Sequence, residues 1–127
     1  MNLEKVVFGF FILLALTLNF GFFIGDIDNP EHHAVYELYA AIVVNLIATV
    51  LKFGERTQIG AILLASSLVA DLQLIAAAVL WGVAVYGTEV GLTPMVTSSI
   101  VSLSGGALLA NLVSVALLII ETTKMHR

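Results

Sequence analysis

The stretch that decides the fold of this chain is residues 59–86, IGAILLASSLVADLQLIAAAVLWGVAVY, an apolar run with one carboxylate, Asp71, near its centre. About 20 apolar residues cross a hydrocarbon core about 30 Å thick. The 28 residues of this run therefore predict a membrane-spanning helix that tilts, protrudes or kinks. An ionised carboxylate in hydrocarbon costs several kcal/mol, so Asp71 must be protonated, hydrated or bound to something positive.

Three further apolar stretches, residues 5–25, 34–53 and 95–120, fill most of the remaining chain. Only 11% of the residues are charged, against roughly 25% in a soluble domain, and the mean hydropathy is +1.06. We therefore predict an all-α fold, an integral membrane bundle of four transmembrane helices forming one domain over residues 1–127. The first span is too long for a signal peptide and lacks a small-x-small cleavage site, so we expect it to be retained. The absence of cysteine excludes disulfides and thiolate metal sites.

The basic residues indicate the orientation of these spans. With four spans, the N-terminus, the second connection and the C-terminal tail share one side of the membrane. All basic residues lie in those segments: Lys5, Lys52, Arg56, Lys124 and Arg127. By the positive-inside rule this side is cytoplasmic. We therefore expect a multi-pass protein of the bacterial inner (plasma) membrane with both termini in the cytoplasm.

Polar side chains inside the predicted spans form the candidate site. Lipid offers no hydrogen-bonding partners, so these groups should face protein or water. The site residues are Asp71, Gln73, Asn45, Asn111, Asn19 and Ser67. Small and polar residues at helical spacing also form a stripe on the fourth span: Thr97, Ser104, Ala107, Asn111 and Ser114. The sequence leaves two interpretations open, an ion site centred on Asp71 and structural hydrogen bonds that fix helix packing.

The depth of Asp71 depends on which part of the third span lies in the membrane. If residues 59–78 do, Asp71 is near the middle, and if residues 67–86 do, it is near the cytoplasmic interface. We favour the deep position, because residues 59–70 are an uncharged run that would otherwise stand in water. No Lys or Arg lies well inside any span, so the sequence offers Asp71 no obvious internal cation.

The outer side of the predicted bundle is acidic. It carries Asp26, Asp28, Glu31, Glu37 and Glu89. In an oligomer such carboxylates would gather cations at an entrance, although acidic residues also simply collect on the translocated side. His33 and Glu37, four residues apart, could share a divalent ion, with Asp26 or Asp28 completing its ligands. A polar turn followed by acids at a helix start explains the same residues.

The sequence also contains a faint internal repeat. Residues 20–26 resemble residues 81–89, since each has an aromatic residue, a glycine, a short apolar run, a glycine and an acid. Residues 45–48, Asn-Leu-Ile-Ala, similarly match residues 111–114, Asn-Leu-Val-Ser. These matches suggest two parallel repeats of a helical hairpin, as found in transporters and channels.

The length and the four-span plan resemble the small multidrug resistance family, whose members use one membrane carboxylate as a proton and cation site. In that family the acid lies in the first span, whereas the first span here offers only Asn19 and the acid is Asp71 in the third. The resemblance therefore covers layout alone, and no residue is carried over. The whole chain is similar to the small uncharacterised four-span proteins of bacterial inner membranes.

These observations predict an oligomeric membrane protein for cation conduction or cation-coupled transport. The competing hypotheses are a structural or accessory subunit of a larger membrane complex and a proton-coupled exporter of small organic cations. We expect no enzymatic activity, since no nucleophile has a neighbouring base and no phosphate-binding loop is present. The expected partners are the lipid bilayer, cations or protons, and further copies of the chain. A net charge of -4 makes nucleic acid an improbable partner, and no cofactor is expected beyond a monovalent or divalent cation.

Overall fold

The computed structural model describes residues 3–25, 29, 35–53 and 57–125 and consists of four long α-helices. Helix α1 is Leu3–Phe23, α2 is Val35–Lys52, α3 is Gln58–Gly87 and α4 is Pro94–Met125. All four are long and apolar enough to cross a membrane. The predicted all-helical fold class is therefore confirmed, and the four candidate spans suggest a multi-pass membrane protein.

Side-chain caps define the ends of the two longer helices. Thr57 precedes α3, and its hydroxyl oxygen accepts a hydrogen bond from the backbone N–H of Gly60 at 2.9 Å. Thr93 precedes α4 and accepts from the N–H of Val96 at 3.2 Å, with Pro94 at the first helical position, where no N–H is needed. Gly91, in the connection between these helices, has φ +72°, a backbone conformation that costs glycine little. These caps satisfy N–H groups that a helix start leaves unpaired.

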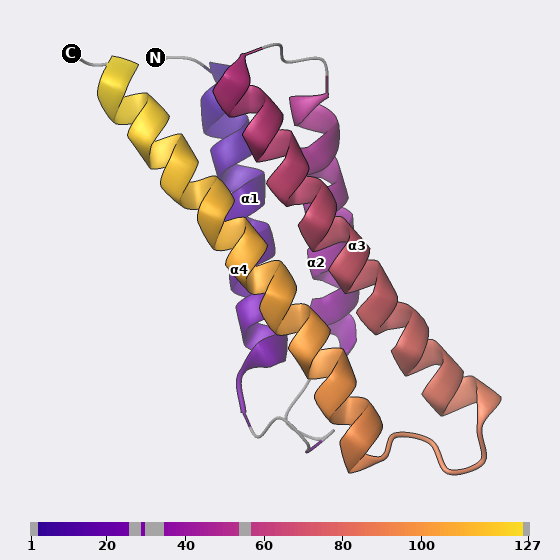
Figure 1. Ribbon diagram of the computed structural model, residues 1–127. Helices are drawn as coiled ribbons and strands as arrows, with labels where there is room; N and C mark the ends of the chain where they lie inside the picture. The colour runs from indigo at the N-terminus through magenta and orange to yellow at the C-terminus, as the bar shows by residue number, and fades with distance from the viewer. Residues whose placement is uncertain (1–2, 26–28, 30–34, 54–56, 126–127) are drawn as a thin grey trace.

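The helices form an antiparallel ring in chain order. Each helix packs against its neighbours in the sequence, and α1 closes the ring by packing against α4. The ends of the described chain, at the start of α1 and the end of α4, lie at the same end of the bundle (Figure 1). At that end Lys5 of α1 and Glu121 of α4 form an ion pair.

The two halves of the bundle differ in length. Helices α3 and α4 have 30 and 32 residues, whereas α1 and α2 have 21 and 18. Ten extra residues correspond to about 15 Å of helix. Figure 1 shows α3 and α4 leaning across the shorter pair and extending past it at the end opposite the termini. The excess length expected for the third span is thus taken up by a lean and a protrusion.

The distribution of side chains is the reverse of that in a soluble bundle. Large apolar side chains are exposed on every helix, among them Phe10, Val43, Leu72, Val83 and Leu109. The buried polar or charged residues are Asn19, Asn45, Thr49, Lys52, Ser67, Asp71, Thr97, Ser104, Asn111 and Ser114. Soluble proteins place such groups on the surface, whereas lipid-facing helices turn them inward because lipid offers no hydrogen bonds. This arrangement supports a lipid environment.

Two apolar clusters fill the remaining interior. One contains Phe22, Leu38, Leu74 and Ile100, with Trp81 packed against it, and the other contains Phe8, Ile12, Ala48 and Leu63. Along α2, Asn45 lies between Ala41 of the first cluster and Ala48 of the second. Along α3, Ser67 lies between Leu63 of the second cluster and Ala70 of the first. The polar residues Asn45 and Ser67 therefore occupy the level at which the two clusters meet.

Candidate functional site

Asp71 lies near the middle of α3 and is only 5% exposed. Helix α3 begins at Gln58 and ends at Gly87, so several helical turns separate the carboxylate from either end of the helix. Along α3, Asp71 comes directly after Ala70 and three residues before Leu74, and both of these residues belong to the same apolar cluster. Asp71 is therefore a carboxylate at mid-height in an apolar bundle.

Two neutral side chains of α2 donate hydrogen bonds to this carboxylate. Asn45 Nδ2 donates to Asp71 Oδ1 at 2.5 Å, and it also donates to the backbone carbonyl of Ser67 at 3.2 Å. Thr49 Oγ1 lies 2.6 Å from Asp71 Oδ2 and 3.0 Å from the backbone carbonyl of Asn45. Asn45 and Thr49 are four residues apart, so they lie on the same face of α2. The 2.6 Å distance from Thr49 Oγ1 is that of a hydroxyl donating to a charged acceptor.

The structure places no fixed positive charge on this carboxylate. Among the described residues, Asp71 makes these two hydrogen bonds and no ion pair. The neighbouring buried cation, Lys52, ends α2, and its Nζ lies 4.4 Å from the centroid of the Phe8 ring. Lys52 follows Thr49 by three residues, which is about 4.5 Å along the helix, without an ion pair to Asp71 among the described residues. Asp71 is thus held by dipoles rather than by a basic partner.

Two polar atoms without partners belong to residues in these hydrogen bonds. Asn45 Oδ1 and Ser67 Oγ are buried, and neither has a hydrogen-bonding partner in the described part of the chain. Both residues are 0% exposed. A buried polar atom without a partner costs about 1–3 kcal/mol, and most such atoms in folded proteins bind a partner such as ordered water. Asn45 Oδ1 and Ser67 Oγ are therefore available to bind a further hydrogen-bond donor or a cation.

Asn111 of α4 lies at about the same height. The Ser66 and Ser114 hydroxyls are 2.5 Å apart, and Gln73 lies against Gly106, so α3 and α4 run antiparallel in a defined register. This register places Asn111 and Asp71 within about 3 Å of each other along the bundle axis, at 1.5 Å per residue. Both side-chain amide atoms of Asn111 are buried and without partners among the described residues. No hydrogen bond joins Asn111 to Asp71 in that part of the chain.

Asn19 belongs to a different contact. Its Nδ2 donates to the backbone carbonyl of Ser104 at 3.0 Å, and the Ser104 hydroxyl donates back to Asn19 Oδ1. This reciprocal pair joins α1 to α4, and both residues are fully buried. The pair gives a partner to both the nitrogen and the oxygen of the Asn19 amide. It therefore functions as a structural link between helices.

Removing one half of this link should destabilise the protein. Ser104→Ala leaves Asn19 Oδ1 buried without a donor, and we expect the free energy of unfolding to fall by about 1–2 kcal/mol. Ser102, exposed two residues away on α4, provides the matched control as Ser102→Ala. Denaturant unfolding in detergent micelles, followed by helical circular dichroism, measures both variants. Equal losses for the two serines would contradict this role.

Gln73 also lies away from the hydrogen bonds of Asp71. A Cβ at Gly106 would be 2.6 Å from Gln73 Oε1, so the amide packs directly against the glycine backbone of α4. The neighbouring Gly105 similarly accommodates the ring of Phe23, whose Cε1 would be 2.8 Å from a Cβ there. The two glycines therefore allow α4 to receive side chains from α3 and α1 at close range.

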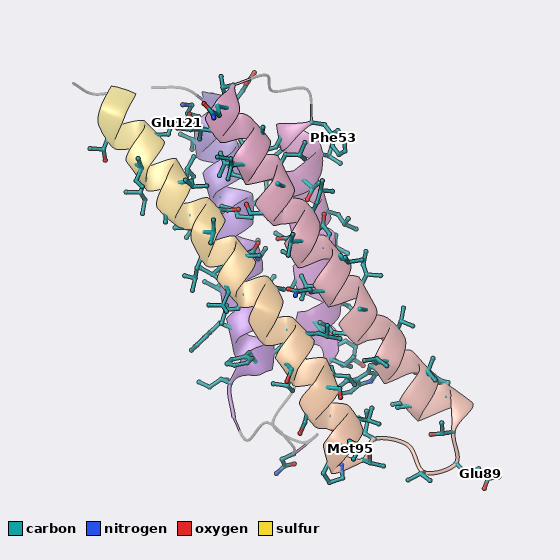
Figure 2. All side chains as sticks on the ribbon, viewed as in Figure 1. Phe53, Glu89, Met95 and Glu121 are labelled. Atoms are coloured by element: carbon teal, nitrogen blue, oxygen red, sulfur yellow. The ribbon has the colours of Figure 1, made fainter. Side chains whose placement is uncertain are left out.

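The acidic entrance predicted from sequence is only partly covered by the structure. Asp26, Asp28, Glu31 and His33 lie outside the described residues. Glu37 packs its carboxylate against Gly21 of α1, and Figure 2 shows Glu89 at the tip of the α3–α4 connection, pointing outward. Within the described residues, no group of three or more His, Cys, Asp or Glu could hold a metal ion.

Comparison with known proteins gives one family. A family of unknown function, DUF6394, matches residues 32–122. The chain belongs to this family. The matched segment includes α2, α3 and most of α4, so it contains Asp71 and both of its described hydrogen-bond donors, Asn45 and Thr49. No curated protein and no solved structure matches the chain.

In this DUF6394 protein the predicted site residues separate into two groups. Asn45, Ser67 and Asp71 lie together, and Asn111 is at the same level, whereas Asn19 and Gln73 make other contacts with α4. Thr49 was missed by the sequence analysis, although it donates directly to the carboxylate. The sequence contains an indication of it, because Thr49 follows Asn45 by one helical turn.

Proposed function

We propose that this protein binds a cation at Asp71 in the course of cation-coupled transport across a membrane. The observation that carries the proposal is a mid-bundle carboxylate, 5% exposed, whose described partners are the neutral donors Asn45 and Thr49. An ionised carboxylate is costly in such a place unless positive charge joins it. Because no basic side chain among the described residues does so, a mobile ion or a proton is the natural partner.

Burial favours transport over an open channel. At 5% exposure, Asp71 is reached by an ion only when the helices move, and such movement is the basis of alternating access. The two hairpins, α1–α2 and α3–α4, are the units that we propose move against each other. The repeat between residues 45–48 and 111–114 supports this assignment, since it relates the two inward-running helices.

Orientation and assembly complete the proposal. Lys5 and Lys52 lie on the end of the bundle at which α1 begins and α2 ends, and we assign this end to the cytoplasm of a bacterial cell by the positive-inside rule. The apolar side chains exposed on all four helices leave surface for lipid and for a second copy. We propose a homo-oligomer in which each copy carries its own Asp71 site.

Flux measurements on reconstituted protein test this function. We expect liposomes containing the protein to take up ²²Na⁺, ⁸⁶Rb⁺ or protons along an imposed gradient, and Asp71→Asn to reduce uptake to the level of empty liposomes. Ser102→Ala, at an exposed position on α4, should retain normal uptake. Normal uptake by a folded Asp71→Asn protein, or the absence of any uptake by the unmodified protein, would rule the function out.

A structural or accessory subunit is the second candidate. The links Asn19–Ser104 and Ser66–Ser114 show that several buried polar groups serve helix packing. Under this alternative Asp71 would do the same in assembly with a larger partner. Purification from native membranes in mild detergent distinguishes the two, because a stoichiometric second protein together with no flux from the isolated chain favours the accessory role.

A further inference from the structure

The polar atoms around Asp71 suggest which cation the site takes. Besides the two carboxylate oxygens, Thr49 Oγ1 and the backbone carbonyl of Ser67 take part in these hydrogen bonds, and the side chains of Asn45 and Ser67 carry the further oxygens Oδ1 and Oγ. Ser67 precedes Asp71 by four residues, so its side chain lies one turn away on the same face of α3. Two of these oxygens, Asn45 Oδ1 and Ser67 Oγ, are fully buried without a described partner.

The two donors to Asp71 can each become oxygen ligands. Rotating the Asn45 amide by half a turn exchanges Nδ2 for Oδ1 at the carboxylate and also releases the carbonyl of Ser67. The Thr49 hydroxyl has one proton and two acceptors in reach, Asp71 Oδ2 at 2.6 Å and the Asn45 carbonyl at 3.0 Å. If the proton turns to the Asn45 carbonyl, the Thr49 lone pairs face the carboxylate. Both changes are rotations about side-chain bonds.

We infer that Asp71, Asn45, Thr49 and Ser67 form a binding site for a sodium ion. This inference rests on the proposed cation transport and specifies its ion. The ligands are all hard oxygens, which suit alkali and alkaline-earth cations rather than transition metals. One carboxylate balances one positive charge, so a divalent ion would leave a buried excess of charge. Thr49 Oγ1 and Asp71 Oδ2 are 2.6 Å apart, and sodium, the smaller of the two alkali ions, requires less separation of these oxygens than potassium.

A proton alone would not use this set of ligands. A protonated carboxylic acid donates one hydrogen bond and needs one acceptor, which the rotated Asn45 amide could supply. It leaves Ser67 Oγ without a function, although this hydroxyl is 0% exposed and has no described partner. Ser67 therefore distinguishes a sodium site from a proton site.

The test compares two adjacent serines with opposite surroundings. The Ser66 hydroxyl contacts Ser114, whereas the Ser67 hydroxyl has no described partner. The melting temperature of the detergent-solubilised protein is measured against NaCl concentration, with choline chloride keeping the ionic strength constant and KCl as the comparison ion. A ligand that binds the folded state alone raises the melting temperature with its concentration.

We expect sodium to raise the melting temperature of the unmodified protein and potassium to do so only at concentrations at least ten-fold higher. Ser67→Ala should weaken the apparent sodium affinity about ten-fold while leaving the sodium-free melting temperature unchanged. Ser66→Ala should lower the sodium-free melting temperature and keep the sodium affinity. An unmodified protein that does not respond to sodium, or two serine variants with the same affinity, would overturn the inference.

Failure of this inference is distinguishable from failure of the proposed function. Proton uptake that depends on Asp71, combined with no sodium-dependent stabilisation, would reject the sodium site and retain cation transport. Sodium-dependent stabilisation that is lost in both Ser67→Ala and Asp71→Asn, without any flux, would retain the site and reject transport.

Discussion

Replacing Asn45 with leucine is expected to lower the free energy of unfolding by about 3 kcal/mol. The amide of Asn45 donates to Asp71 Oδ1 at 2.5 Å, and without it the carboxylate keeps only the hydroxyl of Thr49. Removing a hydrogen-bond donor from a buried carboxylate is costly, because the carboxylate stays desolvated and loses a partner.

A second substitution separates the contribution of the contact between Asn45 and Asp71 from other effects of Asn45→Leu. Adding Asp71→Leu to Asn45→Leu should recover most of the lost stability, because replacing both partners with apolar groups is often close to neutral. Thr49 still has the backbone carbonyl of Asn45 as an acceptor at 3.0 Å. The two single variants and the double variant form a cycle whose coupling energy we expect to be about 2 kcal/mol or more.

Denaturant unfolding in mixed micelles, followed by circular dichroism, measures the cycle. Asn111→Leu is the control, since this amide has no described partner and its loss should leave stability unchanged or higher. If Asn45→Leu and Asn111→Leu have the same effect, or if the double variant loses the sum of the two single losses, the contact between Asn45 and Asp71 does not contribute as proposed.

The fold was predictable from the sequence because it follows from the chemistry of single residues. Four apolar stretches separated by polar turns can form only long helices in lipid, where backbone groups must bond within the segment. The structure has helices over those stretches, and the interior positions of Asn19, Asn45, Asp71 and Asn111 follow from the same rule. The differences lie at helix ends, such as α4, which continues to Met125 rather than stopping near residue 120.

The pairing of the polar residues was not predictable from the sequence, because it depends on how each helix is rotated. A difference of one residue turns a helix by about 100°, so the sequence cannot decide whether Asn19 meets Asp71 or Ser104. The structure joins Asn19 to Ser104 and Gln73 to the backbone of Gly106. Only pairs within one helix, Asn45 with Thr49 and Ser67 with Asp71, could have been found from spacing alone.

Lys52 illustrates the same limit at a helix end. The sequence places it in a polar corner with Phe53, whereas in the structure Lys52 is 4% exposed and lies over the Phe8 ring. The adjacent Phe53 is 63% exposed, like other large apolar side chains of the bundle. Lys52 follows Thr49 by three residues and so shares its inward face, and the aromatic face of Phe8 attracts its ammonium group.

Leucine at Gly106 is expected to have a comparably large effect, lowering the free energy of unfolding by about 3 kcal/mol. A Cβ at this position would be 2.6 Å from Gln73 Oε1 and 2.8 Å from Gln73 Cδ. A methyl group could be accepted by rotation of the flexible Gln73 side chain, so Gly106→Ala should cost much less. A leucine side chain occupies the space of the whole amide and forces α3 away from α4.

The same substitution at Gly82 provides the control. Gly82 lies on α3, and no atom of the described residues lies within 4 Å of the position that a Cβ would take there. Gly82→Leu should therefore leave the stability unchanged or raise it slightly. Unfolding in detergent measures both variants, and size-exclusion chromatography checks that each remains a single species. A separation of α3 from α4 also moves Ser66 away from Ser114. The double variant, Gly106→Leu with Ser66→Ala, should therefore lose less unfolding free energy than the sum of the losses of the two single variants. Strictly additive losses would mean that α4 bends locally at Gly106 instead of moving as a rigid helix.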